Sequence, residues 1–135
     1  MITASALLQQ EECFATAFET GDLETARPLY HPGVVYLSPT VRLFGWPDRI
    51  EGVDRTLEFI RLTVSKLEAI RYRAVEAAIT PGATSAFVRV HFDWTMETER
   101  VRCNYVVIYR YQGGRIGQQE LYYDPGGRLE ILDDR

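Results

Sequence analysis

The stretch "FVRVHFDWTMETERVRCNYVVIYRYQGGRIGQQELYYDP", residues 87–125, decides the fold, because apolar and polar side chains alternate along most of it. A period of two residues indicates β-strands that bury one face in a core. The polar run "ETER" and the pair Gly113-Gly114 predict tight turns between these strands. The stretch therefore predicts antiparallel strands over 85–97, 100–112 and 115–124.

Alternation also identifies the inward face of the first two strands. In the strand 85–97 the inward side chains are Val88, Val90, Phe92, Trp94 and Met96. In the strand 100–112 they are Val101, Cys103, Tyr105, Val107 and Tyr109. The first strand turns His91 and Asp93 the other way, so we expect no carboxylate to point inward from it.

Upstream of these strands the pattern is helical. Residues 4–20 carry Leu7, Phe14 and Phe18 at helical spacing, and Gly21 suits the left-handed position after a helix. Asp22 suits the N-cap of a second helix. The predicted elements are helices over 4–20, 23–30 and 52–66, strands over 34–38 and 69–80, and a loop over 39–52. Helices followed by a run of hairpins is an α+β order.

Length and composition limit the class of protein. A chain of 135 residues is most simply one domain, which we expect to span 1–135 with a polar tail over 125–135. The net charge of −4, without a basic stripe, argues against a nucleic-acid partner. No apolar run is long enough to cross a membrane, and the first residues lack the pattern of a signal peptide. We therefore expect a cytoplasmic protein that does not bind membranes.

The sequence predicts neither a metal nor a cofactor. Cys13 and Cys103 are its two cysteines, and they form no CxxC motif, so buried free thiols are the simpler interpretation. The two histidines, His31 and His91, lie far apart. A structural role suits His31, and a surface or interface position suits His91, although a histidine is also a possible general base. There is no GxGxxG motif and no phosphate-binding loop.

Three stretches carry a family resemblance: "FATAFETGDLETARPLYHPGVVYLSP" (14–39), "EGVDRTLEFI" (51–60) and "GGRIGQQELYYDP" (113–125). They resemble the nuclear transport factor 2-like superfamily, and within it the SnoaL-like, polyketide cyclase-like branch. The resemblance implies a cone-shaped α+β fold in which a curved antiparallel sheet wraps around three N-terminal helices. A deep pocket would open at one end. Members of the superfamily include isomerases, cyclases, epoxide hydrolases, dehydratases and proteins without known activity.

Two catalytic sets known from this superfamily do not carry over to this chain. The tyrosine, the aspartate base and the protonated aspartate of ketosteroid isomerases fall on Phe14, Ser38 and Val107. The aspartate–arginine–aspartate set of limonene epoxide hydrolases falls on Val88, Val90 and Leu121. A tyrosine of the second type does match Tyr36. The resemblance therefore predicts the pocket better than the reaction.

We expect the polar groups of the pocket to be mostly phenols. Alternation turns Tyr105 inward, and the resemblance does the same for Tyr36 and Tyr123. The candidate catalytic residues are Tyr36, Tyr105, Tyr123 and Asp124. The candidate ligand-binding residues are Phe14, Ser38, Trp46, Val90, Phe92, Trp94, Cys103, Gln119 and Leu121. Each has a simpler interpretation: buried tyrosines often only pack, Asp124 precedes a proline as turn formers do, and Trp46 suits a subunit contact equally well.

The leading hypothesis is a pocket for a small hydrophobic molecule, polycyclic or polyketide-like, with cofactor-free proton transfer as the chemistry if the protein is an enzyme: isomerisation, cyclisation or dehydration. The alternative is a non-catalytic binding or accessory protein on the same fold. A third hypothesis is a protein-interaction module that uses the outer face of the sheet. In each case we expect a homodimer, because Phe87, Val106 and Ile108 lie with His91 on the outer face.

Overall fold

The structure is a computed structural model that describes residues 1–124 and 130–132. The helices are α1 (Ala4–Thr20) and α2 (Val53–Val64), with two 3₁₀ helices, η1 (Leu23–Leu29) and η2 (Pro39–Phe44). The strands are β1 (Tyr30–Leu37), β2 (Ile50–Glu51), β3 (Glu68–Ile79), β4 (Ser85–Met96), β5 (Glu99–Gln112), β6 (Arg115–Tyr123) and β7 (Glu130–Leu132).

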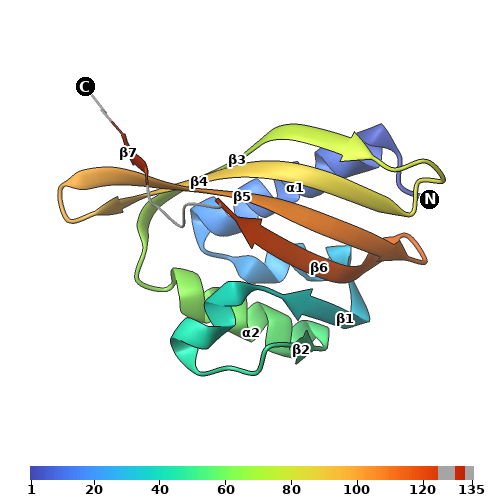
Figure 1. Ribbon diagram of the computed structural model, residues 1–135, viewed down its shortest axis with the longest axis horizontal. Helices are drawn as coiled ribbons and strands as arrows, with labels where there is room; N and C mark the ends of the chain where they lie inside the picture. Colours follow the sequence, from blue (N-terminus) through green and yellow to red (C-terminus); the bar gives the residue numbers. More distant parts are fainter. Residues whose placement is uncertain (125–129, 133–135) are drawn as a thin grey trace.

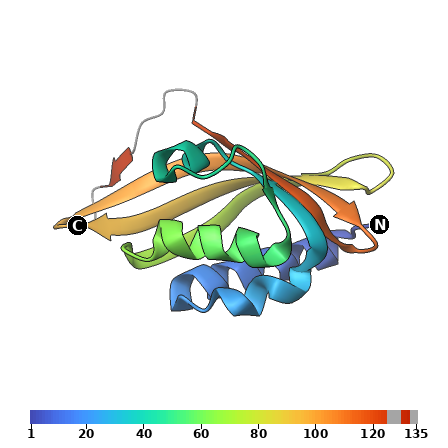
Figure 2. The ribbon, with the colours of Figure 1, turned by 90° about the horizontal axis from the view of Figure 1, so that it is seen from below.

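One curved sheet carries both α-helices on the same face (Figures 1 and 2). Its strand order is β2-β1-β6-β5-β4-β3, and β7 pairs with β5 off this path. Neighbouring strands are antiparallel except β1 and β6, which are parallel. The sheet does not close, because β2 and β3 at the two ends of its strand order do not pair with each other. The predicted α+β class and curved sheet are confirmed.

The sequence predicted four elements less well, and one of them is β1, which begins at Tyr30 and not at Val34. The second helix is the 3₁₀ helix η1, because Pro28 lies inside it and the Asp22 side chain makes no capping hydrogen bond. The predicted loop 39–52 contains η2 and β2. Within the predicted polar tail, residues 130–132 form β7 beside Arg100–Arg102 of β5, and the rest of that tail lies outside the described residues.

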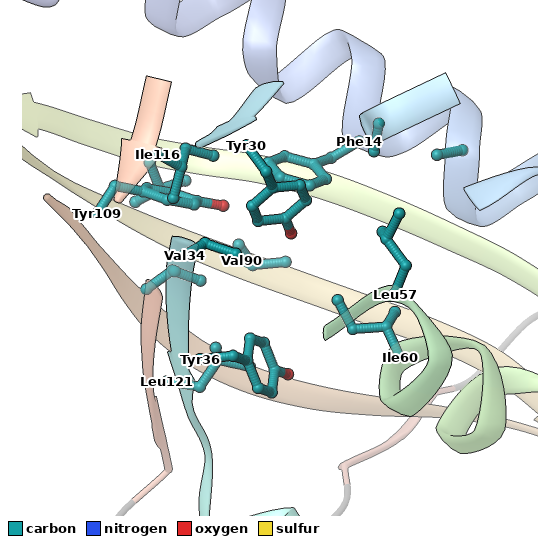
Figure 3. Packing of buried hydrophobic residues seen from close by; sticks show 14 of the residues in the cluster. Phe14, Tyr30, Val34, Tyr36, Leu57, Ile60, Val90, Tyr109, Ile116 and Leu121 are labelled. Atoms are coloured by element: carbon teal, nitrogen blue, oxygen red, sulfur yellow. The ribbon is translucent and has the colours of Figure 1, made fainter. Parts of the chain in front are cut away.

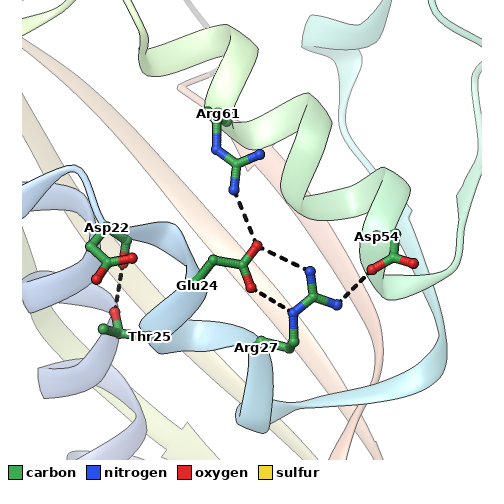
Figure 4. Close-up of polar contacts among 6 residues, drawn as sticks. All are labelled: Asp22, Glu24, Thr25, Arg27, Asp54 and Arg61. Atoms are coloured by element: carbon green, nitrogen blue, oxygen red, sulfur yellow. Dashed lines mark hydrogen bonds and ion pairs between the residues drawn. The ribbon is translucent and has the colours of Figure 1, made fainter.

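Ion pairs hold η1 against α2 (Figure 4). The Arg27 guanidinium donates to Glu24 of its own helix at 2.6 Å and to Asp54 of α2 at 2.6 Å. Arg61 of α2 lies 3.2 Å from Glu24. These side chains are between 39% and 85% exposed, so each pair stabilises the fold only slightly. Together the pairs join η1 to α2, which lines the cavity with Ile60, Thr63 and Val64.

Most of the inward face of the sheet agrees with the alternation, but Met96, predicted to point inward, is 46% exposed at the end of β4. Val88, Val90 and Phe92 of β4 are buried, and so are Tyr105 and Tyr109 of β5. Figure 3 shows the packed core between the sheet and the helices, with Phe14 of α1 and Leu57 and Ile60 of α2 among its labelled members. The sheet therefore presents one continuous apolar surface to the two helices.

Asp93 is an exception on the outer face, because it is buried although its parity is outward. The Arg102 guanidinium on β5 donates to both of its carboxylate oxygens, at 2.7 and 3.1 Å. A two-point arginine–carboxylate pair satisfies both groups with little exposure. No charge of β4 faces the interior, as the sequence predicted.

Candidate functional site

A cavity of about 530 Å³ lies between the concave face of the sheet and the two α-helices. Aromatic side chains make a large part of its wall, among them Phe14, Phe18, Tyr72, Phe92, Trp94 and Tyr105. The rings contact one another: Phe18 and Tyr72 stack with centroids 5.2 Å apart, and Phe92 lies 5.9 Å from Trp94. Such a wall suits a flat, apolar guest.

One side of the cavity carries a cluster of hydroxyl groups on β1, η2 and β6. Ser38 lies 2.8 Å from the Thr40 hydroxyl and hydrogen-bonds the phenols of Tyr36 and Tyr123. Burial raises the pKa of both phenols above the ordinary value. Both phenols are therefore neutral at pH 7, and both lie beside the Ser38 hydroxyl.

Tyr105, at the centre of β5, is different. It is buried, and its ring lies 5.4 Å from that of Tyr123 and 6.4 Å from that of Phe92. Its hydroxyl makes no hydrogen bond among the described residues, and Tyr105 lines the cavity, so the hydroxyl is available to a guest there. Burial raises the pKa of this phenol well above its ordinary value, so it stays protonated and can donate a hydrogen bond to a guest.

Gln119 on β6 supplies an amide beside these phenols. Its carbonyl oxygen accepts a hydrogen bond of 2.6 Å from the Tyr30 hydroxyl, a fully buried group of β1. That bond fixes the orientation of the amide, and it leaves the Nε2 group to face the cavity that Gln119 lines. The cavity therefore offers donors, from a phenol and an amide, to an acceptor atom of a guest.

A carboxyl group lies behind the aromatic wall at the other side. Glu11 of α1 is buried, and it accepts a 2.6 Å hydrogen bond from the Tyr72 hydroxyl and one of 3.0 Å from the Gln10 amide. The Tyr109 hydroxyl lies within hydrogen-bonding range of Glu11 and Tyr72. Burial raises the pKa of the Glu11 carboxyl, and the hydrogen bonds from Tyr72, Gln10 and Tyr109 partly oppose that effect.

Two further groups of the cavity are weaker candidates for chemistry. Burial, together with the nearby Asp124 carboxylate, raises the pKa of the Cys103 thiol to about 11. A thiol that stays protonated at pH 7 is a poor nucleophile. Asp124 lines the cavity at the end of β6, where its backbone N–H donates to the Asn104 carbonyl at 3.0 Å.

Most of the side chains selected from the sequence do line this cavity. They are Phe14, Tyr36, Phe92, Trp94, Cys103, Tyr105, Gln119, Leu121, Tyr123 and Asp124. Three others do not line it: Ser38 is buried behind the phenols, Val90 is covered completely in the core, and Trp46 packs on Phe59 with its ring centroid 5.2 Å away. The Arg55 guanidinium covers the other side of Trp46, 4.9 Å from its ring centroid.

Glu11 and Tyr72 were missed at the level of sequence, although α1 carried a signal. Glu11 follows Leu7 by four residues and precedes Phe14 by three, so it falls in the middle of the apolar stripe that the helix buries. A charged residue at such a position must be paired or neutral. Nothing comparable marked Tyr72, because strand β3 is mostly exposed and its alternation is weak.

The histidines stand apart from the cavity. His31 Nδ1 accepts a hydrogen bond of 3.0 Å from the Gly33 N–H, and His91 lies on the outer face of β4. Among residues 1–124 and 130–132, no cluster of three or more His, Cys, Asp or Glu side chains is placed to hold a metal ion. Within the same part of the chain, no helix combines the length and apolar character needed to cross a bilayer.

Comparison with known proteins gives a family match. Residues 11–118 match the model of a family described as the SnoaL-like domain. This segment includes Glu11, Tyr72, Tyr105 and Tyr109. No curated protein sequence matches the chain.

Solved structures share the fold at low sequence identity. TsrD from Streptomyces laurentii is 18% identical with a TM-score of 0.75, and the match covers 94% of each chain. An NTF2-like protein from Anabaena variabilis is 13% identical with a TM-score of 0.73, over 92% of this chain and 94% of that one. An LEH-like epoxide hydrolase of M. tuberculosis is 18% identical with a TM-score of 0.64, over 86% and 80%. Identities this low establish the fold only.

Proposed function

Because this chain belongs to the family of SnoaL-like domains, we propose that its cavity binds a small hydrophobic molecule of polycyclic or polyketide-like character. The observation that carries the proposal is the unpaired Tyr105 hydroxyl inside an aromatic-walled cavity of about 530 Å³. That volume lies in the range of ordinary ligand pockets. An apolar ring system fills the aromatic wall, and one carbonyl or hydroxyl oxygen of the guest takes the hydrogen bond from Tyr105.

The chemistry that suits this cavity is cofactor-free proton transfer, as in an isomerase, cyclase or dehydratase. The Tyr105 phenol and the Gln119 amide donate hydrogen bonds where negative charge develops on a ligand oxygen. The buried Glu11 carboxyl supplies a proton-accepting group next to the wall. The alternative is a non-catalytic binding protein on the same fold, and the two differ in what loss of the Tyr105 hydroxyl does to turnover.

Ligand binding can be measured from the fluorescence of Trp94, which forms part of the cavity wall. In a Trp46→Phe background Trp94 is the sole tryptophan, since the chain has two. We expect 2-naphthol and 1,8-dihydroxyanthraquinone to quench this emission saturably in buffer containing a metal chelator. The physical reason is direct contact between the guest and the indole ring.

A variant with a filled cavity serves as the control. Thr63 lines the cavity from α2, and Thr63→Phe adds a ring to that space. This variant should fold and lose the saturable quenching. Equal quenching in both proteins, or no saturable quenching by either polycyclic probe, would contradict binding in this cavity.

We further predict a homodimer that uses the outer face of the sheet. Phe87 is 39% exposed and Tyr122 55% exposed, and the half-buried Val106 and Ile108 lie between them in the strand register. An apolar patch of neighbouring residues on three strands is unusual for a surface that stays in water. A two-fold contact would place this patch against its own copy.

Sedimentation velocity at micromolar concentration tests this prediction. The wild-type protein should sediment at twice the monomer mass, and Ile108→Glu should sediment as a folded monomer because a charge would be buried in the contact. Leu43→Glu is a matched control, since Leu43 is 80% exposed and lies on η2, away from the outer face. If the wild-type protein sediments as a monomer, the homodimer prediction is wrong.

A further inference from the structure

Glu11 occupies an unusual position for a carboxyl group, between two separate hollows of the molecule. On one side, Tyr72 and Tyr109 line the cavity, and the Tyr72 hydroxyl donates to Glu11 at 2.6 Å. On the other side, Glu11 itself lines an open depression between α1 and β3, bounded by Ala4, Leu7, Leu8 and residues 74–79. The side chain thus links the cavity, through a phenol, to a surface that water can reach.

We propose that Glu11 is the proton acceptor of the cavity, reached through the Tyr72 hydroxyl, and that the ligand it serves is a weakly acidic phenol or enol. This inference rests on the proposed function, because it assigns a role within the same cavity. It adds the class of ligand group that reacts, the residue that takes the proton, and the path by which that proton leaves.

The transfer uses groups that the structure places together. The O–H bond of the ligand breaks, and its proton forms a bond with the Tyr72 hydroxyl oxygen. At the same time the Tyr72 proton passes across the 2.6 Å hydrogen bond to Glu11. Tyr72 ends unchanged, the carboxylate becomes a carboxylic acid, and the negative charge now lies on the ligand oxygen. There the unpaired Tyr105 hydroxyl donates a hydrogen bond to it.

The surroundings of Glu11 favour both states of this exchange. Three donors, from Tyr72, Gln10 and Tyr109, stabilise the carboxylate, and burial favours the acid. The balance makes Glu11 a stronger proton acceptor than a surface glutamate. The Tyr111 hydroxyl holds the relay in place by donating to Gln10 Oε1 at 2.8 Å. On the cavity side, the titratable groups that face Glu11 from the packed strands are phenols, namely Tyr30, Tyr72, Tyr105, Tyr109 and Tyr111. On the side of the depression, Glu76 of β3 lines the same hollow as Glu11.

The release step follows from the second hollow. After the ligand leaves the cavity as its anion, the Glu11 acid returns its proton to water in the depression between α1 and β3. The cavity itself need not admit water for this exchange. Glu11 can therefore accept a proton from the cavity side and release it on the depression side, so the cavity can stay apolar and poor in water.

The test observes the Glu11 carboxyl directly by ¹³C NMR in protein labelled at the glutamate side-chain carboxyl carbon. The Glu11 resonance is identified as the one that disappears in Glu11→Gln, and Glu12→Gln, an exposed neighbour on α1, is the control that leaves it in place. We expect this resonance to titrate above those of the surface glutamates. Saturating 2-naphthol should lower the midpoint of this titration, because its hydroxyl donates to the Tyr72 oxygen and so strengthens the Tyr72 hydrogen bond to the carboxylate. Naphthalene, which lacks the hydroxyl, should not lower it.

Affinity gives a second readout. The wild-type protein should bind 2-naphthol about 10-fold or more tightly than naphthalene, and this preference should fall to a few-fold in Glu11→Gln and in Tyr72→Phe. If 2-naphthol binds in the cavity and leaves the midpoint of the Glu11 resonance where naphthalene leaves it, the relay is wrong while the binding site stands. If neither probe binds, the proposed function fails and the relay fails with it.

Discussion

Replacing Tyr105 with phenylalanine is expected to lower kcat of a proton-transfer reaction in this cavity by about 100- to 1000-fold. The loss is large because Tyr105 is the buried phenol whose hydroxyl has no partner among the described residues, so its hydrogen bond is available to the reacting oxygen. In a protein that only binds its ligand, the same change should weaken the affinity by about 0.5–1.5 kcal/mol. Steady-state kinetics and equilibrium binding of the same compound distinguish the two outcomes.

Tyr122→Phe is the matched control, because Tyr122 lies on β6, is 55% exposed and donates to Glu120 on the outer face at 2.8 Å. It removes an identical hydroxyl without touching the cavity, and kcat should stay within about 2-fold of the wild-type value. If Tyr105→Phe changes neither kcat nor affinity, the Tyr105 hydroxyl does not contact the ligand, and the proposal that the ligand binds through it in this cavity is wrong.

Alternation predicted the part of the site that lies on long strands. Successive side chains of a strand point to opposite faces of the sheet, so the apolar face of each strand could be identified from its sequence. Tyr105 and Phe92 lie on that face and line the cavity. The polar run and the paired glycines placed the turns, so β4, β5 and β6 were predicted to within a residue or two at each end. Where the pattern was regular, the sequence was enough.

Tertiary contacts decided the elements that the sequence predicted less well. Trp46 was a candidate for ligand binding, but its partly buried ring packs on Phe59 and under Arg55 of α2, and no local pattern encodes that packing. Strand β7 is three residues long, so its pairing with β5 determines it more than its own composition does. Glu11 shows the reverse case, since its position in the apolar stripe was visible but its partner Tyr72 lies 61 residues away.

Replacing Phe59 with alanine is expected to lower the free energy of unfolding by about 3–5 kcal/mol. Phe59 of α2 is completely buried, and three aromatic rings contact it: Trp46 at 5.2 Å, Phe44 at 5.8 Å and Tyr36 at 5.9 Å between centroids. Removing the ring loses its transfer free energy and leaves a space that these large side chains cannot collapse to fill. Chemical denaturation followed by circular dichroism measures the loss.

The same substitution should also loosen the cavity, because Tyr36 and Phe44 line it and both rest on Phe59. Leu62→Ala on the same helix is the control: Leu62 is 42% exposed, so its truncation should cost less than about 1 kcal/mol. If Phe59→Ala were as mild as Leu62→Ala, the ring would not be packed as described. If it were destabilising yet left 2-naphthol affinity unchanged, the wall formed by Tyr36 and Phe44 would not contribute to binding, and the guest would rest on the sheet side of the cavity alone.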